Sequence, residues 1–166
     1  MQDDKRSVPP NPPSLNWRAA LAAGIVAGTV ATAAQVILWW TFTDDLPEIF
    51  FRDARLTSAI LLGQSVLPPP ATSDRMVILV AGLIHVLLSM AYGLALACVI
   101  SRLTRRTALL AGCVFGLILY AVNMHIVTNV YPWFSAARDW ITVVTHVIFG
   151  ISLAAIYKAL SKFYFA

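Results

Sequence analysis

Three histidines are the side chains of this sequence with the greatest chemical potential, and all three lie inside long apolar runs. They are His85, His125 and His146, and the chain contains no other histidine. An imidazole can form hydrogen bonds, bind a metal ion or change its charge near neutral pH. Ionisable groups are rare in apolar segments of this kind, because an unpaired one is costly there. Their positions therefore indicate a buried polar site.

Three interpretations of this site stay open. In the first, the imidazoles hydrogen-bond to Gln35, Asn129 and nearby hydroxyls and only lock the helices together. In the second, they bind a cofactor: a bis-histidine haem b would use His85 and His146, whereas zinc or copper would use all three histidines. In the third, they line a cavity for protons or a small solute, with histidine protonation as the switch.

The sequence carries no motif of a known enzyme or nucleic-acid-binding protein. It contains no HExxH, no GxSxG, no Walker loop and no dinucleotide fingerprint, so we predict no enzymatic activity. No stripe of alternating basic and aromatic residues points to a nucleic-acid partner. The apolar runs contain no Asp or Glu, which argues against a proton pump with a carboxylate relay.

Four membrane-spanning helices are the elements that must position the histidines. Of the 166 residues, 59% are hydrophobic and 12% are charged, whereas soluble domains carry about 25% charged residues. Four apolar runs reach the length of about 20 residues that a hydrocarbon core requires. The predicted spans are residues 17–42, 76–100, 108–130 and 140–163. The predicted fold is therefore an all-α, four-transmembrane-helix bundle in contact with the lipid bilayer.

The remaining segments complete a single membrane domain over residues 17–166. Residues 1–16 are rich in proline and are predicted to be a disordered cytoplasmic tail. The loop over residues 43–75 is predicted to hold a short amphipathic helix on the outer surface, with Ile49, Phe50 and Leu56 on its apolar side. Such a helix either lies on the membrane or forms a lid over the bundle.

Basic residues predict the orientation of the four spans. Lys and Arg concentrate before the first span, between the second and third, and at the end of the fourth. An even number of spans brings these groups to one side, which the positive-inside rule makes cytoplasmic. Both termini should therefore be cytoplasmic. The residues concerned are Lys5, Arg6, Arg18, Arg102, Arg105, Arg106, Lys158 and Lys162.

Helical geometry predicts that one polar side chain from each span lies in a common layer. At 1.5 Å of rise per residue, Gln35, His125 and His146 lie roughly 9–10 Å below the outer boundary, and His85 roughly 13 Å. Each span also carries a stripe of small or polar residues, which should face protein rather than lipid. From these stripes the candidate site residues are His85, His146, His125, Gln35, Asn129, Ser89 and Thr142.

Glycine spacing predicts how the helices pack. Gly24 and Gly28 form a GxxxG motif, and so do Gly112 and Gly116; such pairs let helix backbones approach closely. We interpret both as contacts within the chain, with contacts in a homo-oligomer or to a partner in a membrane complex as the alternative. The short connections predict that the second, third and fourth spans are antiparallel neighbours.

Four short stretches of the sequence form a pattern: Leu83–Ser89, Ala108–Gly112, Pro132–Phe134 and Thr145–Phe149. Over most of residues 20–160 this pattern resembles the YagU-like family of small bacterial inner-membrane proteins. The resemblance implies a four-span bacterial inner-membrane protein with no established biochemical activity.

The resemblance also bears on the histidines. It supports His85 and His146 as site residues, because their positions match the family pattern. His125 departs from that pattern, because the family's third-span histidine aligns nearer Tyr120. A site formed by the pair His85 and His146 is therefore favoured over a three-histidine metal site. The expected role is in envelope homeostasis or as an accessory subunit, and the alternatives are a haem- or metal-binding electron-transfer subunit and a transporter component.

Overall fold

The structure, a computed structural model, describes residues 15–67 and 72–163, and over these residues all regular structure is helical. Four helical segments are long and apolar enough to cross a membrane. This confirms the predicted all-α, four-span fold. The spans are Trp17–Phe42, Arg75–Ile100, Arg105–Asn129 and Trp140–Lys162. Most of the predicted N-terminal tail lies outside the described residues.

Each span begins at a polar residue that caps its first turn. The side chain of Asn16 accepts a hydrogen bond of 3.0 Å from the Ala19 amide and starts α1 (Trp17–Phe42). Asp74 does the same for the Met76 amide at 2.8 Å and starts α3 (Arg75–Ile100). Thr104 precedes α4 (Arg105–Ala121) and Asp139 precedes α5 (Trp140–Phe163), each accepting from an amide three residues later. Such caps satisfy amides that have no partner within the helix.

The third span does not end as a regular α-helix. A π-helical turn, η2 (Val122–Ile126), follows α4, and two 3₁₀ segments, η3 (Val127–Asn129) and η4 (Pro132–Ala137), complete the connection to α5. The guanidinium of Arg138 donates to the Met124 carbonyl and to the Thr128 hydroxyl, the latter at 2.7 Å. These bonds hold the irregular segment in place.

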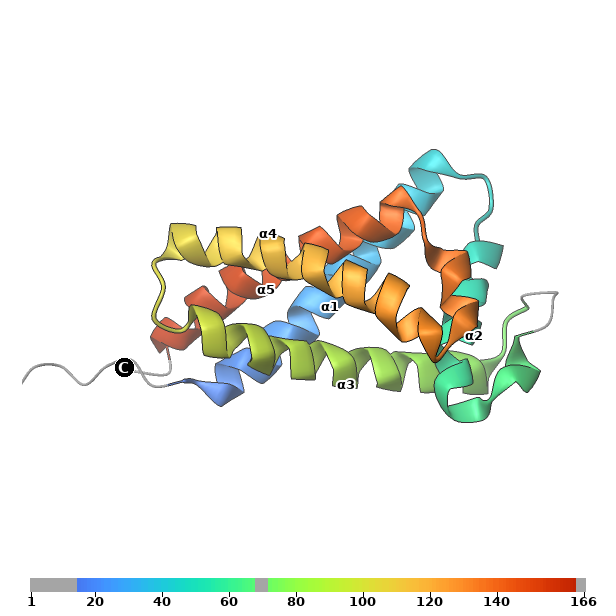
Figure 1. The fold of residues 1–166 in the computed structure, drawn as a ribbon, viewed down its shortest axis with the longest axis horizontal. Helices are drawn as coiled ribbons and strands as arrows, with labels where there is room; N and C mark the ends of the chain where they lie inside the picture. The colour runs from blue at the N-terminus through green and yellow to red at the C-terminus, as the bar shows by residue number, and fades with distance from the viewer. Residues whose placement is uncertain (1–14, 68–71, 164–166) are drawn as a thin grey trace, which may run out of the picture.

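The start of α1 and the end of α5 (the chain ends of the described structure) lie with the α3–α4 connection at one end of the bundle, and α2 (Glu48–Leu62) with η4 lies at the other (Figure 1). Helix α1 packs against both α3 and α5, and α5 packs against α4. Helices α3 and α4 make little contact with each other, so the prediction that these two spans are packed neighbours was wrong. Two of the neighbouring pairs, α1 with α3 and α4 with α5, have glycines at their contacts.

Glycines bring these neighbouring helices to backbone contact. A Cβ atom at Gly24 of α1 would overlap the carbonyl of Ser89 in α3. A Cβ atom at Gly116 of α4 would overlap the carbonyl of His146 in α5, and one at Gly112 would overlap that of Gly150. Gly24, Gly112 and Gly116 therefore lie at contacts within the chain, and Gly28 makes room for two polar side chains of α3 described below.

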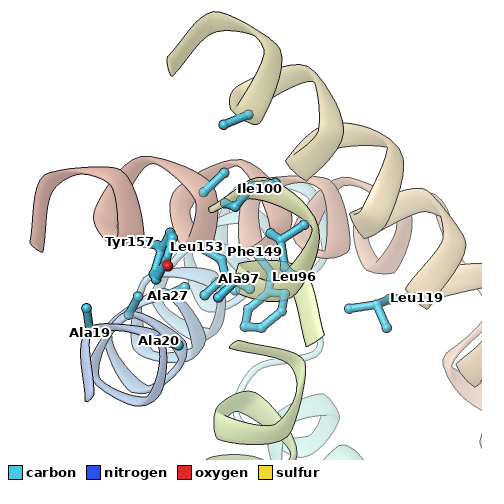
Figure 2. Packing of buried hydrophobic residues seen from close by; sticks show 14 residues of the cluster. Ala19, Ala20, Ala27, Leu96, Ala97, Ile100, Leu119, Phe149, Leu153 and Tyr157 are labelled. Atoms are coloured by element: carbon cyan, nitrogen blue, oxygen red, sulfur yellow. The ribbon is translucent and has the colours of Figure 1, made fainter. Parts of the chain in front are cut away.

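The apolar core fills the half of the bundle near the chain ends. Small residues at the start of α1, such as Ala20 and Ala27, pack against Leu96 and Ile100 at the end of α3 and Leu153 in α5 (Figure 2). These side chains are almost completely buried.

Helix α2 crosses the end of the bundle opposite the chain ends and packs against α3 (Figure 1). Its Ile49, Leu56 and Ala59 are buried, and the indole of Trp133 donates a hydrogen bond of 2.9 Å to the Leu56 carbonyl. Of the two arrangements left open by the sequence, the structure therefore has α2 as a lid over the bundle.

Candidate functional site

The polar residues of the spans surround two adjoining cavities beneath α2. The inner cavity has a volume of about 180 Å³ and is lined by all four spans. The outer cavity has a volume of about 300 Å³ and extends to α2 and η4. Four polar residues line both cavities: Thr32, Gln35, His85 and His146. The two cavities thus form one polar pocket divided by the histidine layer.

A chain of hydrogen bonds joins three helices across the inner cavity. The Tyr92 hydroxyl of α3 donates to the Asn123 Oδ1 atom at 3.1 Å. Asn123 Nδ2 lies 3.3 Å from His146 Nε2 of α5. The other ring nitrogen of His146, Nδ1, lies 2.8 Å from the carbonyl oxygen of Thr142. Asn123 is therefore the link between α3 and α5.

These hydrogen bonds define the tautomer of His146. The Thr142 carbonyl can only accept, so His146 Nδ1 carries a hydrogen and donates it. The Asn123 amide uses its oxygen to accept from Tyr92, and its nitrogen is therefore the donor to His146 Nε2. An Nε2 atom that accepts has no hydrogen. The geometry thus corresponds to a neutral imidazole, with both of its nitrogens already partnered.

His85 has a looser environment. Its Nε2 atom lies 3.2 Å from the hydroxyl of Thr32 in α1, and its side chain is exposed at the edge of the pocket. A Cβ atom at Gly28 would come within 3.1 Å of His85 Nε2 and within 2.5 Å of the Ser89 hydroxyl. The missing side chain of Gly28 therefore makes the room in which both groups of α3 sit.

The structure brings most of the predicted site residues together, but not all of them. His85, His146 and Gln35 line both cavities, Ser89 lines the inner cavity and Thr142 lines the outer one. His125 and Asn129 are exposed and line neither cavity. The predicted residues that line the pocket thus come from the first, second and fourth spans, whereas those of the third span lie outside it.

The irregular end of the third span explains why His125 and Asn129 lie outside the pocket. A π-helical turn accommodates one more residue than an α-helical turn and rotates the residues that follow it. His125 lies within that turn, beside Tyr120, with 5.9 Å between the ring centroids. Among the described residues, no three His, Cys, Asp or Glu side chains are grouped to hold a metal ion. The three-histidine metal site is therefore not formed.

Asn123 and Tyr92 were not among the predicted site residues, although helical spacing indicates both of them. Asn123 follows Gly112 by eleven residues, close to three helical turns, so it lies on the same face as Gly112 and Gly116. Tyr92 follows Ser89 by three residues and continues the His85–Ser89 stripe.

Asp53 is a third residue that was missed, and it brings a carboxylate to the outer cavity. With Phe50, Ala54 and Thr57 it forms the side of α2 that lines this cavity. Arg52 donates two hydrogen bonds, of 2.9 and 2.8 Å, to Asp53 Oδ1. The pKa of Asp53 is nevertheless raised from its ordinary value, chiefly because burial removes the carboxylate from water.

The arrangement of the two histidines does not suit a bis-histidine haem. Such a haem requires both Nε2 lone pairs to point at one iron atom between them. Here His85 Nε2 faces Thr32 of α1, whereas His146 Nε2 faces Asn123 of η2. The two nitrogens are directed at different helices and are held there by different partners.

Fold and site together define a class of protein: a four-span α-helical membrane protein with a pocket beneath a helical lid. No family model, no curated protein and no solved structure matches the chain. The resemblance to the YagU-like family therefore stays a prediction.

Proposed function

We propose that this chain is a small bacterial inner-membrane protein, without enzymatic activity, that binds a small ligand in the polar pocket near the periplasmic face. A role in envelope homeostasis or as an accessory subunit of a membrane complex fits such a protein. The resemblance of the histidine-containing stretches to the YagU-like family supports this context.

The charge distribution supports an orientation with both termini in the cytoplasm. The α3–α4 connection, with Arg102, Arg105 and Arg106 at or beside it, lies at the same end of the bundle as the start of α1 and the end of α5, and α2, which contains Asp53, lies at the other end (Figure 1). A reporter enzyme that is active only outside the cytoplasm, fused after Lys162, should stay inactive. Activity of this reporter would show that the protein has the opposite orientation, with the pocket near the cytoplasm.

The observation that carries the binding function is the pair of cavities that share four polar residues. A bundle that used its histidines only for packing would fill this space with side chains, as the other half of this bundle does. The densely packed core closes the pocket towards the chain ends. A pocket that is closed at one end favours the binding of a ligand over its passage through the chain, and so over a transporter.

Cysteine labelling tests this function. In a background in which Cys98 and Cys113 are replaced by Ala, Gln35→Cys places a thiol on the wall of both cavities. It should react with methyl methanethiosulfonate in the folded, detergent-solubilised protein. Ala27→Cys, eight residues earlier in the same helix and fully buried in the apolar core, is the matched control and should stay unmodified. Equal protection of both thiols would show a packed interior and contradict the proposal.

A further inference from the structure

Two residues that line the outer cavity carry a buried polar group without a partner. The indole Nε1 of Trp39 and the hydroxyl of Thr142 have no hydrogen-bond partner among the described residues. The two residues are 3% and 4% exposed, and both line the outer cavity. Because an indole N–H can only donate, only an acceptor atom can satisfy it. A buried polar group without a partner is unfavourable, so both groups point to a bound molecule that carries acceptor oxygens.

The charges around the outer cavity favour an uncharged ligand. Among the residues that the structure describes, Asp53 is the one carboxylate on its wall, and Arg52 already donates two hydrogen bonds to it. None of the described Lys and Arg residues lines this cavity, so these walls offer no cationic partner to an anion. A cationic ligand would have to compete with Arg52 for Asp53.

The remaining walls of the outer cavity are aromatic and aliphatic. Trp39, Phe50 and Phe134 contribute aromatic rings, and Ile78 and Met124 contribute aliphatic surface. Walls of this kind, with a few donors among them, suit a flat ring with polar atoms at its edge. The volume of about 300 Å³ is at the lower end of the range for small-molecule sites.

An opening of the outer cavity faces the bilayer. Gly82 and His85 line the cavity and are exposed, although both lie within the α3 span. Gly82 lies roughly 10 Å along the helix from Arg75, which is at the depth of the hydrocarbon. A Cβ atom at Gly82 would meet nothing within 4 Å. Exposed residues at this depth adjoin lipid, so a ligand can enter from the bilayer.

We infer that the outer cavity binds the ring of a lipid-soluble quinone, which enters beside Gly82 and accepts hydrogen bonds from Trp39 and Thr142. This inference rests on the proposed binding function. A quinone is uncharged and flat and has two carbonyl oxygens, which match the two unpartnered donors. No electron transfer is part of the assignment.

Calorimetric titration of the full chain in detergent tests the assignment. The probe is 2,3-dimethyl-1,4-naphthoquinone, and the comparison compound is 2,3-dimethylnaphthalene, which has a similar shape but no carbonyl. We expect saturable binding of one quinone per chain, at least tenfold tighter than that of the hydrocarbon. Thr142→Val, which keeps the side-chain shape but removes the hydroxyl, should weaken quinone binding about tenfold. Equal affinities for both compounds, or an unchanged affinity in Thr142→Val, would overturn the inference.

The entry route has its own matched pair of variants. Gly82→Trp should block the opening and lower the rate of quinone association at least tenfold, measured from the time course of binding after rapid mixing. Leu83→Trp changes the next residue, which is also exposed but lines neither cavity, and it should leave the association rate unchanged. Equal effects of both variants would contradict entry beside Gly82.

The cysteine experiment separates the two proposals. If Gln35→Cys reacts but the quinone does not bind, the pocket stands and the quinone assignment fails. If Gln35→Cys does not react, both fail.

Discussion

Replacing Gly150 with Ala should lower the free energy of unfolding by about 1–3 kcal/mol, the usual cost of inserting a methyl group into a closely packed contact. The added Cβ atom would overlap the carbonyl of Gly112 and lie 2.9 Å from the Gly116 amide nitrogen. Both neighbours are backbone atoms of α4, so no flexible side chain can move aside. Helices α4 and α5 would have to separate, and His146, four residues before Gly150, would move with α5.

The control for this variant is Gly82→Ala. Gly82 is also in the interior of a helix, but the added methyl group would meet nothing within 4 Å. It should stabilise the protein by about 0.5–1 kcal/mol, because alanine loses less backbone entropy than glycine in a helix. Denaturant unfolding followed by circular dichroism measures both variants. Equal stability of the two proteins would contradict the close packing of α4 against α5.

Asn123→Leu should also destabilise the protein, by about 2–3 kcal/mol, because it removes two hydrogen bonds and leaves partly buried polar groups without partners. Tyr92 would lose the acceptor of its hydroxyl, and His146 would lose the donor to Nε2. Leucine has the same number and branching of side-chain heavy atoms as asparagine, so the variant keeps the side-chain shape and removes the hydrogen-bonding atoms. The same unfolding measurement applies.

Asn129→Leu is the matched control for Asn123→Leu. Asn129 is exposed and lines neither cavity, and its replacement should change the unfolding free energy by less than about 0.5 kcal/mol. A larger loss in Asn129→Leu than in Asn123→Leu would mean that the third span presents the face predicted from regular helical spacing. The hydrogen-bond chain through Asn123 would then be wrong.

The sequence predicted the spans well because the length of an apolar run is a direct consequence of bilayer thickness. The run from Trp17 to Phe42 is a single helix with those bounds. The positions of His85, His146 and Gln35 around one pocket also followed from regular spacing, because α1, α3 and α5 are regular helices up to and beyond these residues.

Two features of the site could not be predicted from spacing. The π-helical turn at Val122–Ile126 changes the rotation of the third span, and no proline or glycine within it signals the change. The contribution of Asp53 depends on how α2 folds over the bundle, which is a long-range contact and not a property of its local sequence. The separation of α3 from α4 also depends on long-range contacts. Gly93 brings α3 into close contact with α1, and Gly150 brings α5 into close contact with α4.

The ¹⁵N chemical shifts of His146 test most directly whether the helices converge as described. In protein labelled with ¹⁵N-histidine, assigned by comparison with His85→Ala and His125→Ala, the ring should give the pattern of a neutral imidazole with hydrogen on Nδ1 and none on Nε2. The Nε2 signal should shift in Asn123→Leu, because its donor is lost. A hydrogen on Nε2, or a His146 spectrum unaffected by Asn123→Leu, would contradict the pocket.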